Sequence, residues 1–255
     1  MVAEFQGLTA IVTGGASGIG LQAASLLADR GANVACLDLD TAGIEAPLIA
    51  ERCDVTDDSS VRGAIGAVVQ RYGRLDIVIN NAGVGAQGDV VANDDDEWRR
   101  VFEVNVFGIV RVTRAALPYL RQSPFPAVVN TCSIVASCGL PNRALYSATK
   151  GSVLALTLAM AADYVGDGIR VNCVNPGTTD TPWIDRILAA VDDPLAERST
   201  LIRRQPMGRL VSAEEVAYAI AYLASPLCAS TTATALAVDG GMRGLRVPPP
   251  GNTGT

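Results

Sequence analysis

Two side chains that can exchange a proton stand four residues apart, at Tyr146 and Lys150. They begin a long apolar stretch, Gly151 to Val165, whose composition predicts a helix. Residues four apart lie on one face of a helix, so the phenol and the ammonium group can share a pocket. Because a nearby positive charge favours the phenolate, this pair could act as an acid and base. The alternative is a chance spacing of two ordinary helix residues.

The composition excludes several other classes of chemistry and partner. The 255 residues include no histidine, which excludes Ser-His-Asp and Cys-His catalysis and histidine-ligated metals. The six cysteines are scattered without a Cys-x-x-Cys spacing, as is typical of reduced core residues, and we expect no metal centre. A net charge of −6 disfavours nucleic acid as a partner, because binding a phosphate backbone requires a basic face.

The sequence predicts a cytoplasmic protein. Met1 to Gly7 has no basic stretch followed by an apolar core, so no secretory signal is expected. The uncharged run Val216 to Val238 is long enough for a membrane span, but Pro226 and a cluster of Ser and Thr favour a helix, a loop and a strand. We therefore expect no membrane partner and a small-molecule substrate.

A glycine-rich turn near the N-terminus has the composition of a phosphate-binding site. The apolar run Leu8 to Thr13 predicts a strand, and the pattern Leu21 to Arg30 predicts a helix. Glycine permits positive φ and a close approach to a ligand, and the following helix N-terminus offers free N–H groups. A dinucleotide would fit this turn, and a plain tight turn is the alternative. The candidate cofactor contacts are Gly14, Ser17, Gly18, Ile19 and Gly20.

An acid at the end of the second predicted strand, Asn33 to Leu37, indicates the cofactor. Asp38 stands where the hydroxyl groups of a ribose would lie in such a βαβ unit. Its charge would repel a 2′-phosphate, and neither Ala16, Ser17 nor Leu39 supplies a competing positive charge. The prediction is NAD rather than NADP, and the alternative is a solvated turn acid.

Further candidates follow later strands of the same pattern. A strand near Glu51 to Cys53 leads to Asp54 and Val55, and a strand at Asp76 to Asn80 leads to a polar turn. That turn contains Asn81, Ala82 and Gly83. Ligands in open α/β sheets bind at the carboxyl ends of the strands, so this turn and the glycine-rich turn should lie side by side.

The middle of the chain carries one polar residue in an apolar place. The acidic run Asp94 to Glu97 predicts the first turn of a helix that reaches about Leu120, and Asn105 lies inside it. A buried core amide and a functional kink are both consistent with this pattern. The next strand, Pro126 to Thr131, ends just before Ser133, which precedes the Tyr146 helix.

The C-terminal part completes one domain. A strand at Ile169 to Val174 leads to the turn Asn175 to Thr178, and a last helix and strand end near Val238. No composition break divides the chain, so we expect a single Rossmann-type α/β domain at residues 1–246. Residues 181–210 follow no single pattern and are expected to form a small lid over the substrate. The Pro/Gly-rich tail at 247–255 is expected to be mobile.

Taken together, these motifs resemble the short-chain dehydrogenase/reductase family in order and spacing. The matching motifs are Thr13 to Gly20, Asp54-Val55, Asn80 to Gly83, Asn105, Ser133, Tyr146 with Lys150, and Asn175 to Thr178. The resemblance implies a doubly wound, seven-stranded, mostly parallel sheet with helices on both faces. It also implies hydride transfer between NAD(P) and an alcohol or carbonyl.

The resemblance also implies roles for individual residues. Tyr146 would be the acid/base, Ser133 would bind the substrate oxygen, and Lys150 would support the phenolate and bind the nicotinamide ribose. Asn105 would open its helix to hold a water in a proton relay. The remaining cofactor contacts would be Pro176, Gly177, Thr178 and Thr181. Cys132 stands where many relatives have serine, which should affect packing more than chemistry.

Three shorter motifs are Asn142-Arg143, Pro176 to Trp183, and Arg203-Arg204-Gln205 with Gly208-Arg209. They resemble a subgroup that contains type 2 R-β-hydroxybutyrate, 2-keto-3-deoxy-L-fuconate and L-fucose dehydrogenases. In its hydroxy-acid members, arginines matching Arg143, Arg186 and Arg204 are implicated in gripping the substrate carboxylate, which suits a guanidinium fork. Trp183, in the same motif as the Pro176 turn, is a further substrate candidate. The alternative is that these arginines are solvated lid or surface residues.

The sequence thus predicts a cytoplasmic NAD-dependent dehydrogenase of a small hydroxy acid or deoxy-sugar acid. A dehydrogenase of a neutral sugar, polyol or cyclic alcohol is the alternative, and a catalytically silent NAD(H)-binding regulatory protein is a third. The resemblance implies a homo-oligomer, either a dimer or a tetramer.

Overall fold

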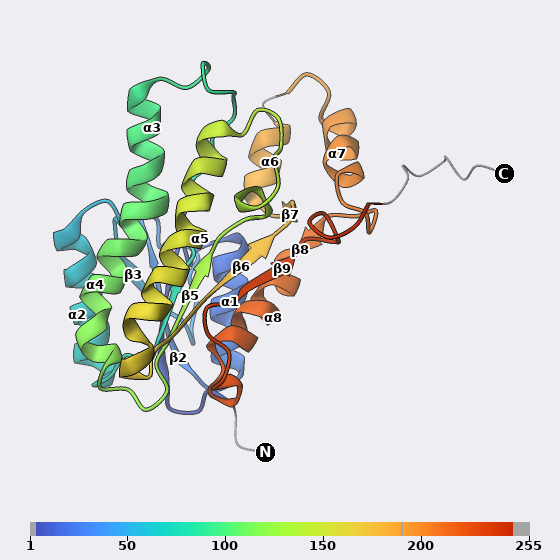
Figure 1. The fold of residues 1–255 in the computed structure, drawn as a ribbon. Coiled ribbons are helices and arrows are strands. Elements are labelled where there is room, and N and C mark those ends of the chain that lie inside the picture. The colour runs from blue at the N-terminus through green and yellow to red at the C-terminus, as the bar shows by residue number, and fades with distance from the viewer. Residues whose placement is uncertain (1–3, 190, 247–255) are drawn as a thin grey trace.

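Seven parallel strands form one twisted sheet at the centre of the molecule (Figure 1). The computed structural model describes residues 4–189 and 191–246, so the predicted mobile tail at 247–255 lies outside the described residues. In sheet order the strands are β3 (Ile49–Arg52), β2 (Asn33–Asp38), β1 (Thr9–Thr13), β4 (Ile77–Asn80), β5 (Ala127–Thr131), β6 (Arg170–Pro176) and β9 (Ala235–Val238). Every neighbouring pair is parallel, so the predicted mostly parallel sheet is parallel throughout these seven strands.

The central strands are buried on both faces. All residues of β1, β4, β5 and β6 are buried, which explains why these segments are continuous apolar runs rather than alternating patterns. The strand order reverses direction between β1 and β4. In a doubly wound sheet this reversal leaves a crevice at the carboxyl ends of the strands, which is where a ligand binds.

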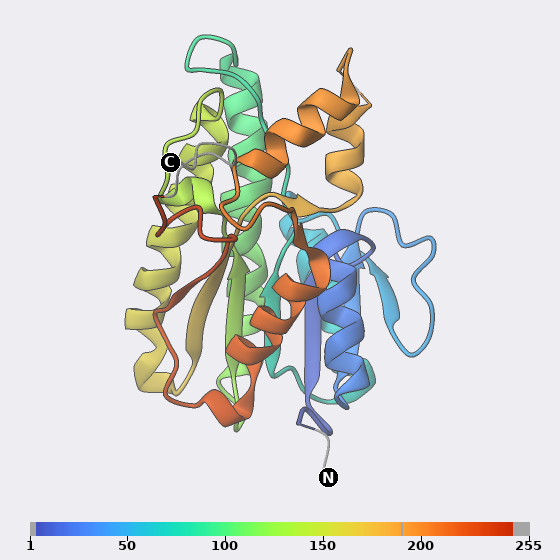
Figure 2. The same ribbon diagram turned by 90° about the vertical axis from the view of Figure 1, so that its right-hand side faces the viewer.

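Helices cover both faces of the sheet (Figures 1 and 2). One core cluster joins the sheet to α2 (Asp58–Tyr72), α4 (Gly108–Leu120) and α5 (Ala144–Tyr164). A second cluster joins the other face to α1 (Gly18–Asp29) and α8 (Ala213–Ala224). The segment Ala144–Asp167 is long and apolar enough to span a membrane, but α5 packs its buried residues Val153 and Met160 into the first cluster, as a core helix does.

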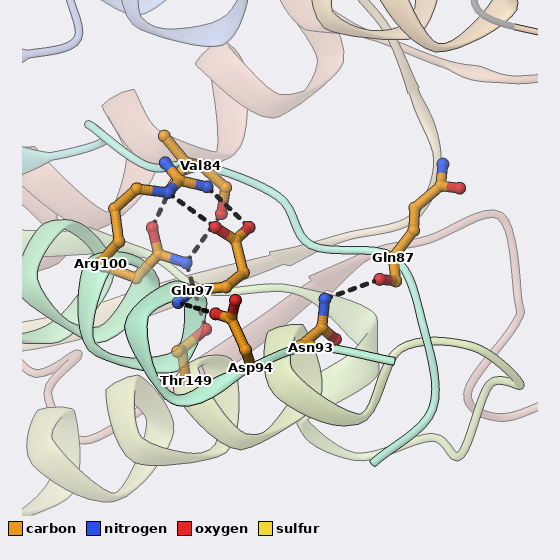
Figure 3. Close-up of polar contacts among 8 residues, drawn as sticks. Val84, Gln87, Asn93, Asp94, Glu97, Arg100 and Thr149 are labelled. Atoms are coloured by element: carbon orange, nitrogen blue, oxygen red, sulfur yellow. Dashed lines mark hydrogen bonds and ion pairs between the residues drawn. The ribbon is translucent and has the colours of Figure 1, made fainter. Parts of the chain in front are cut away.

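The predicted helix after the acidic run is interrupted at the position of Asn105. It consists of α3 (Asp95–Phe102), a π-helical turn (Glu103–Phe107) and α4. The acidic run begins it as expected, because Asp94 Oδ1 accepts a hydrogen bond from the amide of Glu97 at 2.8 Å (Figure 3). A π-turn inserts an extra residue and changes which side chains face inward. This turn points the Asn105 amide into the protein, where it is buried.

Residues 181–210, which follow no single pattern in the sequence, form two short helices beyond the carboxyl end of the sheet (Figure 2). They are α6 (Pro182–Leu188) and α7 (Pro194–Arg203), and both begin with proline, which is favoured at the first helical position. A two-stranded pair, β7 (Thr179–Asp180) and β8 (Val211–Ser212), joins the two ends of the segment. Ile184, Leu201 and Leu210 form a small apolar cluster inside it.

A buried arginine connects the sheet to the end of α8. Arg170 is 8 % exposed, and its Nη1 donates to the carbonyls of Leu223 at 2.6 Å and Thr231 at 3.2 Å. Its Nη2 donates to the carbonyls of Ala224 at 3.1 Å and Ser225 at 3.0 Å. A cation at a helix C-terminus also offsets the negative end of the helix dipole.

We expect Arg170→Met to lower the free energy of unfolding by about 3 kcal/mol, because the buried residues Leu223 and Ala224 lose the side-chain donor to their carbonyls. Urea denaturation at matched protein concentration measures the change. Arg62→Met is the control, since Arg62 forms only an exposed pair with Asp58, and it should cost less than about 0.5 kcal/mol. Equal effects of the two changes would contradict a bridging role for Arg170.

Candidate active site

A cavity of about 490 Å³ lies at the carboxyl ends of the strands. It is bounded by the turns after β1, β2, β4, β5 and β6, the start of α5 and the start of α6. Most of the residues predicted from the sequence line it: Gly14, Ser17, Gly18, Ile19, Asp38, Asp54, Val55, Asn81, Ala82, Gly83, Ser133, Tyr146, Lys150, Pro176, Gly177, Thr181, Trp183 and Arg186. The fold therefore brings segments from across the whole sequence to one place.

Hydrogen bonds hold the first glycine turn against the turn after β4. The amides of Asn81 and Ala82 both donate to Thr13 Oγ1 at 3.0 Å. Asn81 Nδ2 donates to the carbonyl of Thr13 at 3.2 Å and to that of Gly14 at 3.1 Å. A Cβ at residue 14 would lie 2.9 Å from Ala82 Cα, so only glycine fits there. The prediction that these two turns lie side by side is confirmed.

The glycine-turn end of the cavity has the donors that a dinucleotide needs. Ser17 makes no side-chain cap at the start of α1, and no acid lies in the first turn, so the positive end of the helix faces the cavity without a counter-charge. Asp38 stands at the end of β2 beside this turn, with Oδ2 accepting from the amide of Ala16 at 3.0 Å. An uncapped helix end and a carboxylate match the pyrophosphate and the ribose of NAD respectively.

Gly20 differs from the other predicted cofactor residues. It does not line the cavity, because α1 packs there onto the glycine turn. A Cβ at this position would overlap the carbonyl oxygen of Gly14. Gly20 thus permits close packing between the helix and the turn.

Lys150 and Tyr146 share one side of the cavity. Lys150 is 4 % exposed, and its Nζ donates to the carbonyl of Thr131 at 2.8 Å. The same Nζ lies 5.7 Å from the centroid of the Tyr146 ring. Ser133 follows β5 and lines the same cavity, and its Oγ accepts from the amide of Val135. A phenol, a buried ammonium group and a hydroxyl group therefore line the same cavity.

Asn105 ties the π-turn to two parts of this site. Its Nδ2 donates to the carbonyl of Val84 at 2.9 Å and to Thr149 Oγ1 at 3.1 Å. Its Oδ1 accepts from the amide of Val84 at 2.8 Å. Val84 lies in the loop after β4 and Thr149 lies on α5 (both labelled in Figure 3), so these hydrogen bonds join the two segments. Asn105 thus fixes the helix that carries Tyr146 and Lys150 relative to the loop opposite.

Cys132, the departure from the serine of many relatives, contacts the main chain of α5. Its thiol donates to the carbonyl of Lys150 at 3.2 Å. A hydrogen bond from Cys173 lowers the pKa of Cys132, and the charge of Lys150 lowers it further, against the opposing effect of burial. The thiol lies between the catalytic candidates and the core, and it supports the position of Lys150.

Thr178, Arg143 and Arg204 lie outside the lining of the main cavity. The carbonyl of Thr178 accepts from Gln205 Nε2 at 3.2 Å and from the amide of Val211 at 3.0 Å, which fastens the turn after β6 to the far end of the α6–α7 segment. Arg143 lines a neighbouring cavity of about 460 Å³. Burial lowers the pKa of the Arg143 guanidinium, and the nearby charge of Arg204 lowers it further.

The structure adds cavity residues that were not predicted from the sequence, and it shows a charged neighbour of Asp38. Val84 and Gly85 line the cavity after β4, beyond the motif that ends at Gly83. Arg52 on β3 stands opposite Asp38 in the sheet register and donates to the carbonyl of Leu39 at 3.3 Å. Arg52 therefore places a positive charge near Asp38 at the end of β2. The sequence alone does not show this contact, because it depends on the pairing of β2 with β3.

An oxidoreductase that binds NAD(H) is the class of protein defined by this fold and cavity. Comparison with known proteins agrees: residues 14–243 match the family described as enoyl-(acyl carrier protein) reductase. The chain belongs to the short-chain dehydrogenase/reductase family, its cofactor is NAD(H), and it is an enzyme of the dehydrogenase type.

Two curated relatives cover nearly the whole chain. The chain is 40% identical to cis-4-hydroxycyclohexanecarboxylate dehydrogenase of Sinomonas cyclohexanicum, over 91% of this chain and 95% of the relative. It is 37% identical to 2-keto-3-deoxy-L-fuconate dehydrogenase of Xanthomonas campestris pv. campestris, over 93% of this chain and 81% of the relative.

Solved structures share the fold. The ligand-free aldohexose dehydrogenase of Thermoplasma acidophilum superposes with a TM-score of 0.90 at 33% identity, over 97% of this chain and 100% of that one. The 3-ketoacyl-(acyl-carrier-protein) reductase of Brucella melitensis, complexed with NADH, superposes with a TM-score of 0.86 at 32% identity, over 94% of this chain and 99% of that one.

We expect Asp38→Asn to narrow the preference for NADH over NADPH by at least about tenfold. The amide keeps an acceptor for the Ala16 N–H but loses the charge that repels a 2′-phosphate. Dissociation constants from fluorescence titration measure the ratio without a substrate. Asp40→Asn, which removes an exposed charge two residues further on, should leave the ratio unchanged. An unchanged ratio in Asp38→Asn would show that another residue selects the cofactor.

Proposed function

We propose that this enzyme oxidises a secondary hydroxyl group of a small hydroxy acid or deoxy-sugar acid with NAD and reduces the matching ketone in the reverse direction. The proposal that the substrate is an acid depends on one observation, the surroundings of Arg143. Arg143 lies close enough to Arg204 and Tyr146 for both to influence its pKa. Within residues 4–189 and 191–246, neither arginine forms an ion pair, and Glu197 affects Arg143 only through its charge.

The two positive guanidinium groups repel each other, and burial adds to this cost for Arg143, so an anion bound between them is stabilising. A substrate carboxylate supplies such an anion, and the planar guanidinium fork binds it with two hydrogen bonds. The names of two relatives support this choice, since one acts on a hydroxycyclohexanecarboxylate and the other on a deoxy-sugar acid. The alternative is a neutral sugar or cyclic alcohol, which is favoured by the likeness to an aldohexose dehydrogenase.

In the proposed mechanism, the Tyr146 phenolate removes the proton from the substrate hydroxyl. Ser133 Oγ donates a hydrogen bond to the same oxygen and holds its negative charge as the carbonyl forms. Lys150 supplies the positive charge that favours the phenolate, and the bond from its Nζ to Thr131 keeps it in place. NAD, which the glycine turn and Asp38 would hold, would supply the acceptor for the hydride of the carbinol carbon. Asn105 holds α5 and the β4 loop at the spacing that these contacts need.

The remaining features of the proposal concern organisation. Residues 1–246 form one domain in which residues 181–210 act as the substrate lid, and Thr178 contacts the nicotinamide amide. We propose a homo-oligomer, a dimer or a tetramer, because α5 exposes Leu158 and α8 exposes Tyr218 and Tyr222. A cytoplasmic location suits the six cysteines, all of which are free.

Tyr146→Phe tests the acid/base. We expect kcat to fall by about 10³-fold, because the ring remains but the ionisable hydroxyl is lost. The dissociation constant of NADH should change less than about threefold, since the contacts of Lys150 and the glycine turn stay intact. Tyr164→Phe removes a hydroxyl from the far end of the same helix and serves as the control. Activity retained in Tyr146→Phe would remove tyrosine from the mechanism.

Replacement of Arg143 or Arg204 by alanine tests the carboxylate contact. Each change should raise KM for a hydroxy acid by about 10- to 100-fold and leave KM for the corresponding uncharged amide within about threefold. Arg203→Ala is the matched control, because Arg203 is exposed, directly precedes Arg204 and donates to Thr200. Equal losses for acid and amide would exclude a carboxylate at these arginines and favour the neutral substrate.

A further inference from the structure

The substrate side of the cavity contains one large aromatic side chain that bridges the lid and the β4 loop. Trp183 is the second residue of α6 and is 37 % exposed. Its ring centroid lies 6.3 Å from that of Tyr146, with 36° between the ring planes. The two rings are therefore tilted against each other, and both residues line the cavity.

The position of the Trp183 indole explains why residue 85 is a glycine, although its backbone conformation does not require one. Gly85 has no positive φ, so another residue would suit its conformation. A Cβ at residue 85, however, would overlap Trp183 Cζ2 and lie 3.1 Å from Cε2. The absence of a side chain at Gly85 lets the indole lie directly against the main chain of the β4 loop.

The start of α6 is also fixed on the cofactor side. A Cβ at Gly18 would lie 3.4 Å from Thr181 Cγ2, so the first glycine turn and the residue that precedes α6 are in close contact. Thr181 Oγ1 donates to the carbonyl of Thr179. The start of α6 thus contacts the glycine turn through Thr181, and the indole contacts Gly85 directly.

We propose that Trp183, seated on Gly85, selects substrates whose hydroxyl-bearing carbon belongs to a ring. This inference rests on the proposed function, because it assumes that Tyr146 receives the hydroxyl proton and that Arg143 and Arg204 hold an acid. A compact ring placed with its hydroxyl at Tyr146 and Ser133 covers the flat indole surface. A linear chain bound by the same two polar ends leaves much of that surface in contact with water.

The test compares two hydroxy acids with the same number of bonds between the carboxylate and the carbinol carbon. These are cis-4-hydroxycyclohexanecarboxylate, which is cyclic, and 5-hydroxyhexanoate, which is linear. The measured quantity is the ratio of kcat/KM for the cyclic acid to kcat/KM for the linear acid. We expect Trp183→Leu to lower this ratio by about tenfold, and Trp183→Phe to retain most of it.

Gly85→Ala should lower the ratio by a similar factor, because the new methyl group displaces the indole from its seat. In the double variant Gly85→Ala/Trp183→Leu the two losses should not add, since both remove the same contact. Trp98→Phe is the control: this tryptophan packs on Phe102 in α3, and its replacement should leave the ratio unchanged. A ratio unaffected by Trp183→Leu, or losses that add in the double variant, would overturn the proposal.

A binding measurement separates this inference from the proposed function. The chain has two tryptophans, so in the Trp98→Phe variant all indole emission comes from Trp183. Added to the complex with NADH, cyclohexanecarboxylate should change this emission at concentrations where hexanoate does not. If that response occurs but no hydroxy acid is oxidised, the ring subsite stands and the proposed reaction is wrong. If hydroxy acids are oxidised but the two ligands act alike, the reaction stands and the ring subsite is wrong.

Discussion

The contact between the turn after β1 and the turn after β4 is the constraint on which the rest of the site depends. At this point the strand order reverses, and the two turns separate from the sheet in opposite directions. Asn81 closes the gap by bonding to the carbonyls of Thr13 and Gly14, and glycine at position 14 lets the two main chains touch. The crevice keeps its shape because main-chain groups define it, so the cavity needs few large side chains.

The side of the cavity that contains Tyr146 and Lys150 depends on a second bridge, made by Asn105. An ordinary α-helical continuation from α3 to α4 would alter the direction of this side chain, because a π-turn shifts the register by one residue. With the turn present, one amide satisfies both main-chain groups of Val84 and reaches Thr149 on α5. Lys150, the next residue along α5, is held from its other end by Thr131. Its charge is therefore fixed by two elements that would otherwise be independent.

Much of the sheet and the cofactor half of the cavity could be predicted from sequence because the signals there are local. Apolar runs that end in glycine or asparagine mark the buried strands and their turns, and Asn105 was conspicuous as a polar residue in an apolar pattern. The sequence of residues 181–210 shows no clear helical pattern. The reason is that α6 and α7 have only 7 and 10 residues and each buries a single residue. Contacts such as Gly85 with Trp183, or Asp38 beside Arg52, join distant segments and carry no local pattern.

The two halves of the cavity differ in how firmly they are attached to the core. Tyr146 and Lys150 lie on α5 and Ser133 follows β5, and both elements contribute residues to the main core cluster, so replacing their neighbours disturbs the sheet. Trp183 lies on α6 and Arg204 directly follows α7, and these helices pack around their own cluster of Ile184, Leu201 and Leu210. That cluster is joined to the sheet through the β7–β8 pair and Gln205. Side chains of this segment can therefore change at little cost in stability, which lets one catalytic frame serve substrates of different shape.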